Sequence, residues 1–201
     1  MTSERFEFFF DFVSPTAYLA WHAAPAVIER SGAEMALRPM FLGGVMQASG
    51  NKPPGTVPAK ARYLGIDLER CARHLDVPFH MNPAFPFNSR PALRATLGLA
   101  DDPKAQARFV DRCFHLAWGV ETPRDFGESE ALAEAADLAG LDAERIAALA
   151  VDEANKAALK ANTEEAVARG TFGAPTFFVG EEIFFGHDRL DYVERALTRA
   201  P

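Results

Sequence analysis

The chain has 201 residues, of which 48% are hydrophobic and 24% charged, a composition that fits a globular protein with one substantial core. Its formal net charge of −7 argues against binding to nucleic-acid phosphates, because such binding needs clustered Lys and Arg. No apolar stretch approaches the roughly 20 residues that span a bilayer, and the N-terminus lacks a signal-peptide pattern. We therefore expect a cytoplasmic protein that neither enters a membrane nor binds nucleic acid.

The two cysteines, Cys71 and Cys113, are too far apart for a CxxC redox or zinc motif, so we expect reduced structural thiols. The histidines also lack metal-ligand spacing, and no metal site is predicted. Four of them are expected to be structural or exposed: His22, His74, His80 and His115.

The first predicted element is a strand over residues 4–12, a Phe-rich run that alternates in part with acids. A helix should follow at once, because Ser14 is a favourable N-cap and Pro15 a favourable first helical residue. Ser31-Gly32 predicts the end of that helix, and residues 34–42 predict a second strand. These elements would form a right-handed βαβ unit.

The middle of the chain has a helical character. Residues 50–58 predict a Gly- and Pro-rich loop, residues 58–75 a helix, and residues 76–91 an irregular Pro-rich link. The Ala- and Leu-rich stretch over 91–169 predicts four or five further helices. The candidate helix ends in that stretch are Gly98-Leu99, Gly119, Gly127 and Gly140.

Strand character returns near the C-terminus, where residues 171–186 predict a β-hairpin and residues 188–200 a closing helix. The order βαβ, helical block, ββα predicts an α/β, thioredoxin-like fold with a large all-helical insertion between the two halves. Residues 1–48 and 170–201 would form the thioredoxin-like domain, and residues 49–169 the helical insertion domain.

The start of the first helix carries the main chemical prediction. In thioredoxin-like proteins this helix terminus stabilises a thiolate, typically within a CxxC motif. Here Ser14-Pro15-Thr16-Ala17 replaces both cysteines, so disulfide exchange by the protein's own thiols is not expected. The terminus still favours an anion, and the Ser14 hydroxyl could donate to a sulfur supplied from outside. The alternative is a plain helix cap.

Three other segments could complete a ligand site. The loop before the hairpin would carry a cis-proline at Pro175, with the backbone of Ala174 free to pair with an extended ligand; a simple turn is the alternative. Asp188 could accept from an α-ammonium group, or cap the last helix. Asn51 suits a peptide group and Lys60 a carboxylate, although both could belong to a solvated surface. Trp118 and Phe85 are expected to pack in the core or the insertion rather than line a pocket.

Together these segments resemble the 2-hydroxychromene-2-carboxylate isomerase family and the related kappa-class glutathione transferases, members of the DsbA-type thioredoxin superfamily. The resemblance covers nearly the whole chain. Its motifs are FDFVSPTAYLA, GNKPPGTVPAKARYLGIDLERCARHLDVPF, FNS at 87–89 and TFGAPTFFVGEEIFFGHDRLDYVERAL.

The resemblance implies glutathione as the cofactor and assigns roles to seven residues. Ser14 would be catalytic, since its hydroxyl would hold the glutathione thiolate. The implied cofactor-binding set is Ser14, Asn51, Lys60, Ala174, Pro175, His187 and Asp188. Ala174 would pair with the cysteinyl unit, and His187 with Asp188 would receive the γ-glutamyl end.

The implied activity is the interconversion of 2-hydroxychromene-2-carboxylate and trans-o-hydroxybenzylidenepyruvate by a homodimer, with the glutathione thiolate as a transient nucleophile. The small aromatic carboxylate substrate calls for a cation, and Lys60, Arg62 and Arg90 are the candidates. Two alternatives remain open: a kappa-like glutathione transferase acting on another electrophile, and a non-catalytic thioredoxin-like module that binds glutathione or a peptide.

Overall fold

The computed structural model describes residues 5–199, and its centre is a four-stranded sheet of order β2-β1-β3-β4. The strands are β1 (Arg5–Phe10), β2 (Glu34–Pro39), β3 (Thr176–Val179) and β4 (Glu182–Phe185). β1 pairs in parallel with β2 and antiparallel with β3, so the two ends of the chain meet in the middle of the sheet. β3 and β4 form the predicted hairpin. This arrangement confirms the thioredoxin-like fold.

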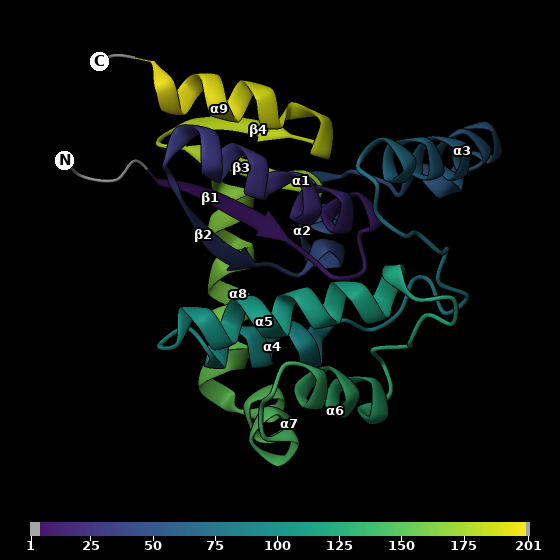
Figure 1. Cartoon of the computed structure of the whole chain (residues 1–201), viewed down its shortest axis with the longest axis vertical. Helices are drawn as coiled ribbons and strands as arrows, with labels where there is room; N and C mark the ends of the chain where they lie inside the picture. Colours follow the sequence, from purple (N-terminus) through teal and green to yellow (C-terminus); the bar gives the residue numbers. More distant parts are fainter. Residues whose placement is uncertain (1–4, 200–201) are drawn as a thin grey trace.

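One face of the sheet is covered by α1 (Pro15–Ser31) and α9 (Leu190–Thr198), which lie side by side (Figure 1). α1 begins where predicted, because the Ser14 side chain accepts a hydrogen bond from the Ala17 N–H. It ends where predicted, because Gly32 adopts a left-handed conformation with φ of 67°. A short 3₁₀ turn, η3 (His187–Arg189), precedes α9.

The opposite face carries a helix that the sequence analysis missed, α2 (Leu42–Ser49). The second strand was expected to reach residue 42, but it ends at Pro39. Gly43 and Gly44 are poor helix formers, and the residue before the helix, Phe41, offers no side-chain cap. The cap comes instead from Asp11, whose Oδ2 accepts from the Leu42 N–H at 2.8 Å. Because Asp11 lies 31 residues away, no local pattern indicated this helix.

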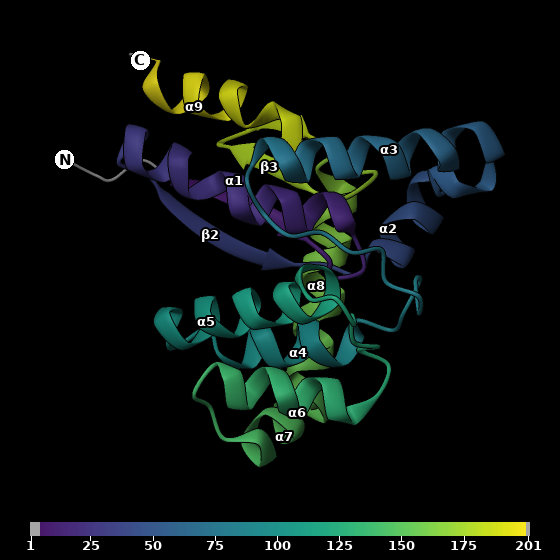
Figure 2. The same cartoon turned by 45° about the vertical axis from the view of Figure 1, so that its right-hand side comes forward.

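The helices between the two halves form a separate layer. Within residues 91–169 the chain forms α4 (Arg90–Gly98), α5 (Pro103–Phe114), α6 (Ser129–Leu138), α7 (Ala143–Val151) and α8 (Glu153–Ala168), which confirms the predicted number. A π-helical turn (His115–Gly119) extends α5 and ends at a predicted stop. Figures 1 and 2 show α4 to α7 gathered at the end of the molecule opposite α9, while α8 runs between this group and the sheet. The long α3 (Pro58–His74) lies away from the group.

The helical layer packs directly onto the end of β1. The Phe12 and Phe114 ring centroids are 4.9 Å apart, and the Trp118 indole N–H donates to the Phe12 carbonyl at 2.8 Å. Trp118 is fully buried, as expected for a packing residue. One apolar cluster therefore spans both the sheet and the insertion. The boundaries at 48/49 and 169/170 stay a prediction. Over residues 5–199, no helix combines the length and apolarity needed to span a bilayer.

Candidate functional site

A cavity of about 370 Å³ opens at the N-terminus of α1. Its walls come from the starts of α1 and α2, the loop around Asn51, the link before α4, and the loop before β3. Three of the predicted site residues line it: Ser14, Asn51 and Ala174. The fold thus brings together side chains and backbone from positions up to 160 residues apart.

Ser14 lies at the base of this cavity with 4% of its surface exposed. Its hydroxyl caps α1 by accepting from the Ala17 N–H at 3.2 Å, and it donates to the Ala174 carbonyl at 3.1 Å. The Ala174-Pro175 peptide bond is cis, as the fold predicted. Within residues 5–199 the Ala174 N–H has no hydrogen-bond partner. A cavity-lining backbone donor is therefore available to a ligand.

Thr16 adds a second hydroxyl at the same point. Its Oγ1 donates to the Ala174 carbonyl at 3.0 Å and lies 3.0 Å from the Ser14 Oγ. The two hydroxyls and the carbonyl oxygen therefore form a closed triangle of contacts. The sequence analysis did not assign a role to Thr16.

Asn51 and Lys60 hold different positions relative to the cavity. The Asn51 Nδ2 donates to the Phe172 carbonyl at 2.8 Å, which ties the loop before α3 to the loop before β3. Lys60 is exposed on the first turn of α3 and is not a lining residue. Leu64, one turn further along the same helix face, does line the cavity. Lys60 therefore lies outside the lining, on the helix face that reaches the cavity at Leu64.

His187 and Asp188 are not brought into the Ser14 cavity. They line a second cavity of about 500 Å³, together with Cys71 and His74. The preceding residue, Gly186, donates its N–H to the Pro175 carbonyl at 3.0 Å, which ties this segment to the cis-proline loop. Burial lowers the pKa of His187 below its ordinary value. Asp188 forms an exposed ion pair with Arg189 at 2.8 Å.

Aromatic rings form one wall of the Ser14 cavity, and the expectation for Phe85 was wrong in this respect. Phe85 is 46% exposed and lines the cavity, because it lies on the irregular link before α4 rather than inside a helix. Its ring also contacts Trp118, with centroids 6.0 Å apart. Phe185 of β4 supplies a second ring, packed on Phe172 with centroids 4.5 Å apart.

The described residues that line this cavity include no charged side chain. The three candidate cations therefore lie outside its lining. Arg62 is exposed on α3. The Arg90 guanidinium lies 5.4 Å from the centre of the Phe41 ring, and its Nε donates to the Asn88 side chain at 2.9 Å.

Asp11 does not line the cavity, but it is a second residue that the sequence analysis passed over. It is fully buried and accepts hydrogen bonds from the Val13 N–H at 3.1 Å, the Leu42 N–H at 2.8 Å and the Ser89 hydroxyl at 2.5 Å. Burial raises the pKa of the Asp11 carboxyl above its ordinary value, although its hydrogen bonds oppose the shift. One carboxylate thus joins the segments that begin α1, α2 and α4. The sequence did carry one signal of this role, because Asp11 is an acidic residue inside a run of phenylalanines.

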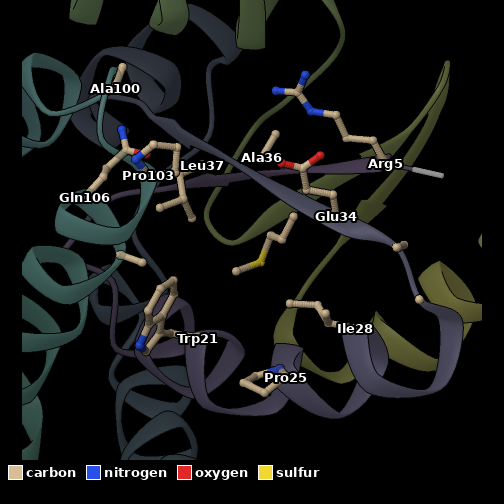
Figure 3. Close-up of a pocket in the computed structure, with 14 residues that line it drawn as sticks. Arg5, Trp21, Pro25, Ile28, Glu34, Ala36, Leu37, Ala100, Pro103 and Gln106 are labelled. Atoms are coloured by element: carbon tan, nitrogen blue, oxygen red, sulfur yellow. The ribbon is translucent and has the colours of Figure 1, made fainter. Parts of the chain in front are cut away.

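A larger cavity, about 710 Å³, lies elsewhere, between α1 and the edge strand β2 (Figure 3). Trp21, Pro25 and Ile28 of α1 point toward the strand, and Leu37 points back toward them. None of the predicted site residues lines this cavity. Size alone therefore does not identify the functional site.

The two cysteines do not pair with each other in the structure. Both cysteines are free thiols, and burial raises the pKa of each. No group of His, Cys, Asp or Glu within residues 5–199 could hold a metal ion.

Comparison with known families agrees with the fold. The model of the DSBA-like thioredoxin domain matches residues 5–198, and the chain therefore belongs to that family. Two curated relatives indicate which members of this family the chain resembles in sequence. A 2-hydroxychromene-2-carboxylate isomerase of Sphingobium xenophagum is 34% identical over 97% of this chain and 98% of its own. Human glutathione S-transferase kappa 1 is 29% identical over 95% of this chain and 89% of its own.

A solved structure of 2-hydroxychromene-2-carboxylate isomerase superposes with a TM-score of 0.86. It is 27% identical, and the match covers 96% of this chain and 94% of that one. The predicted membership among the 2-hydroxychromene-2-carboxylate isomerases and their kappa-class relatives is thus confirmed.

Proposed function

We propose that this protein is a glutathione-dependent isomerase that interconverts 2-hydroxychromene-2-carboxylate and trans-o-hydroxybenzylidenepyruvate. The observation that carries the proposal is the convergence of the Ser14 hydroxyl, the Ala174 backbone and the Asn51 amide on one cavity with aromatic walls. The Ser14 hydroxyl lies at the N-terminus of α1, which suits the sulfur of glutathione, and the neutral groups of Ala174 and Asn51 suit its peptide groups. Membership in the isomerase family supports the same activity.

In this proposal Ser14 holds the sulfur, Ala174 pairs with the cysteinyl backbone, and Asn51 contacts the peptide. When bound, glutathione would supply a thiolate, the nucleophile for an isomerisation in which the substrate ring opens and glutathione is regenerated. The protein lowers the pKa of the thiol through the α1 terminus and the Ser14 hydrogen bond. Phe85 and Phe185 pack against the aromatic ring of the substrate.

Lys60, His187, Asp188 and Pro175 have supporting roles in the proposal. Lys60 attracts a carboxylate at the rim of the cavity. His187 and Asp188 receive the γ-glutamyl end, since Gly186, which precedes them, is hydrogen-bonded to Pro175 next to Ala174. We also propose that the protein acts as a homodimer in the cytoplasm, where its two free thiols would stay reduced.

The test is a spectrophotometric assay of purified protein with 2-hydroxychromene-2-carboxylate, with and without glutathione. Turnover that saturates with glutathione and falls by about 100-fold in Ser14→Ala is expected, since a hydrogen bond to a charged group contributes about 1.5–3 kcal/mol. Ser129→Ala, at the exposed start of α6, is the matched control. Turnover without glutathione, or a fully active Ser14→Ala, would contradict the mechanism.

A second activity is favoured by one observation. Because the described lining residues are uncharged, the cavity also suits a neutral aromatic electrophile, as expected for a kappa-like glutathione transferase. Formation of a conjugate with a generic aryl halide, in the absence of isomerisation, would establish that alternative. Glutathione binding without either turnover would identify a binding module.

A further inference from the structure

We propose that Thr16 is a positioning residue. Its hydroxyl donates a hydrogen bond to the Ala174 carbonyl, so that the Ser14 proton is free to hydrogen-bond a ligand sulfur. This inference rests on the glutathione site proposed above and adds a residue to it. It starts from the triangle formed by the Ser14 Oγ, the Thr16 Oγ1 and the Ala174 carbonyl oxygen, with sides of 3.0, 3.0 and 3.1 Å.

The number of protons limits what this triangle can do. Each hydroxyl has one proton to donate, and the carbonyl oxygen has two lone pairs and none. Three contacts therefore share two protons. Within residues 5–199 the Ala174 carbonyl accepts from Ser14 and Thr16 and from no other donor. The Ser14 Oγ also accepts from the Ala17 N–H, and its single proton can point to the Ala174 carbonyl or to the Thr16 Oγ1.

A ligand sulfur changes this arrangement. When the Ser14 proton turns toward the sulfur, its bond to Ala174 is lost, and a buried carbonyl that loses a partner costs free energy. Thr16 keeps one lone pair of that carbonyl occupied, and the amide of a bound peptide can take the other. Without the Thr16 hydroxyl, Ala174 and the sulfur would compete for the single Ser14 proton.

Thr16 itself lines the cavity, and a direct contact with the ligand would have a different consequence from the role proposed here. Thr16 acts through the carbonyl and through Ser14, so its hydroxyl should matter only while Ser14 is present. A hydroxyl that donated to the sulfur itself would matter whether or not Ser14 were present. A hydroxyl that only stabilised α1 would change stability and leave the bound thiol unaffected.

The experiment measures the pKa of protein-bound glutathione from the ultraviolet absorbance of its thiolate. Thr16→Val is close to isosteric and should raise this pKa by about half a unit to one unit, since a neutral hydrogen bond contributes about 0.5–1.5 kcal/mol. Thr16→Ala should give the same rise, and Thr16→Ser should restore the value of the parent protein. Thr198→Val, on exposed α9, is the matched control.

The decisive variant is the double substitution Ser14→Ala/Thr16→Val, whose thiol pKa should equal that of Ser14→Ala alone. An additive rise would overturn the proposal by showing that Thr16 contacts the sulfur. An unchanged pKa in Thr16→Val and Thr16→Ala would overturn it as well, with the glutathione site left standing. If the parent protein binds no glutathione, the proposed function fails, and the inference fails with it.

Discussion

The buried carboxylate of Asp11 gives the clearest test of how the site is held together. Asp11→Asn keeps the shape of the side chain but leaves one accepting oxygen where there were two. Oδ1 serves Val13 and Ser89, and Oδ2 serves Leu42. In the variant, either the Leu42 N–H or the Val13 N–H must face an amide NH₂ group. A buried donor without an acceptor costs about 1–3 kcal/mol, and we expect that loss in the free energy of unfolding.

The effect should also depend on pH. Burial raises the pKa of Asp11 in the folded protein above its ordinary value of 3.8, so the folded state binds this proton more tightly than the unfolded state does. The resulting stability is fully present below pH 3.8 and is lost as the pH rises through the folded-state pKa. Asn has no such proton, and the stability gap between the parent protein and Asp11→Asn should widen as the pH falls toward 4.

Urea unfolding at several pH values, monitored by circular dichroism, measures both effects. Asp137→Asn, an exposed position on α6, should change neither stability nor its pH dependence. The reasoning is refuted if Asp11→Asn is as stable as the parent protein at pH 7. It is also refuted if the stability gap stays constant from pH 7 to pH 4.

Three further predictions concern the cavity and the thiols. Phe85→Ala should raise KM for the aromatic substrate about tenfold and leave glutathione affinity unchanged, because only the aromatic wall is lost; steady-state kinetics checks this. Gly173→Val should weaken glutathione binding in calorimetry, since even a Cβ would lie 2.7 Å from the Phe185 ring. Cys71, partly exposed, should react with a thiol reagent in the native protein, whereas buried Cys113 should react only after unfolding.

The parts of the fold that could be predicted are those that depend on neighbouring residues. Ser14 caps α1 through the Ala17 N–H three positions on, and Gly32 ends it through its own left-handed backbone. Such contacts lie within one helical turn, so sequence spacing reveals them. The capping of α2 depends on Asp11 in another strand, and no local pattern could reveal it.

At the site, too, the sequence revealed local motifs but not contacts between distant segments. Ser14 and Ala174 were found from a motif and from the expected cis-proline, and the structure places both in one cavity. The aromatic wall was missed because Phe85 lies on a link whose course is set by tertiary packing against Trp118. A single sequence could not show which side of that ring would be covered. Thr16 belongs to the same motif as Ser14, but its role was missed because its partner, Ala174, lies 158 positions away in the sequence.

Among residues 5–199, those that line the cavity carry no charge, which restricts how a carboxylate substrate can bind in the proposed reaction. A carboxylate placed inside would lose its hydration without a cationic partner, and that loss costs several kcal/mol. The aromatic ring of the substrate should prefer the inside of the cavity, because it can pack there against Phe85 and Phe185. The substrate should therefore enter ring first, with its carboxylate at the rim, on the side of Lys60. In that orientation the Lys60 charge acts on the substrate from water-exposed surface, so replacing it should raise KM more at low salt than at high salt.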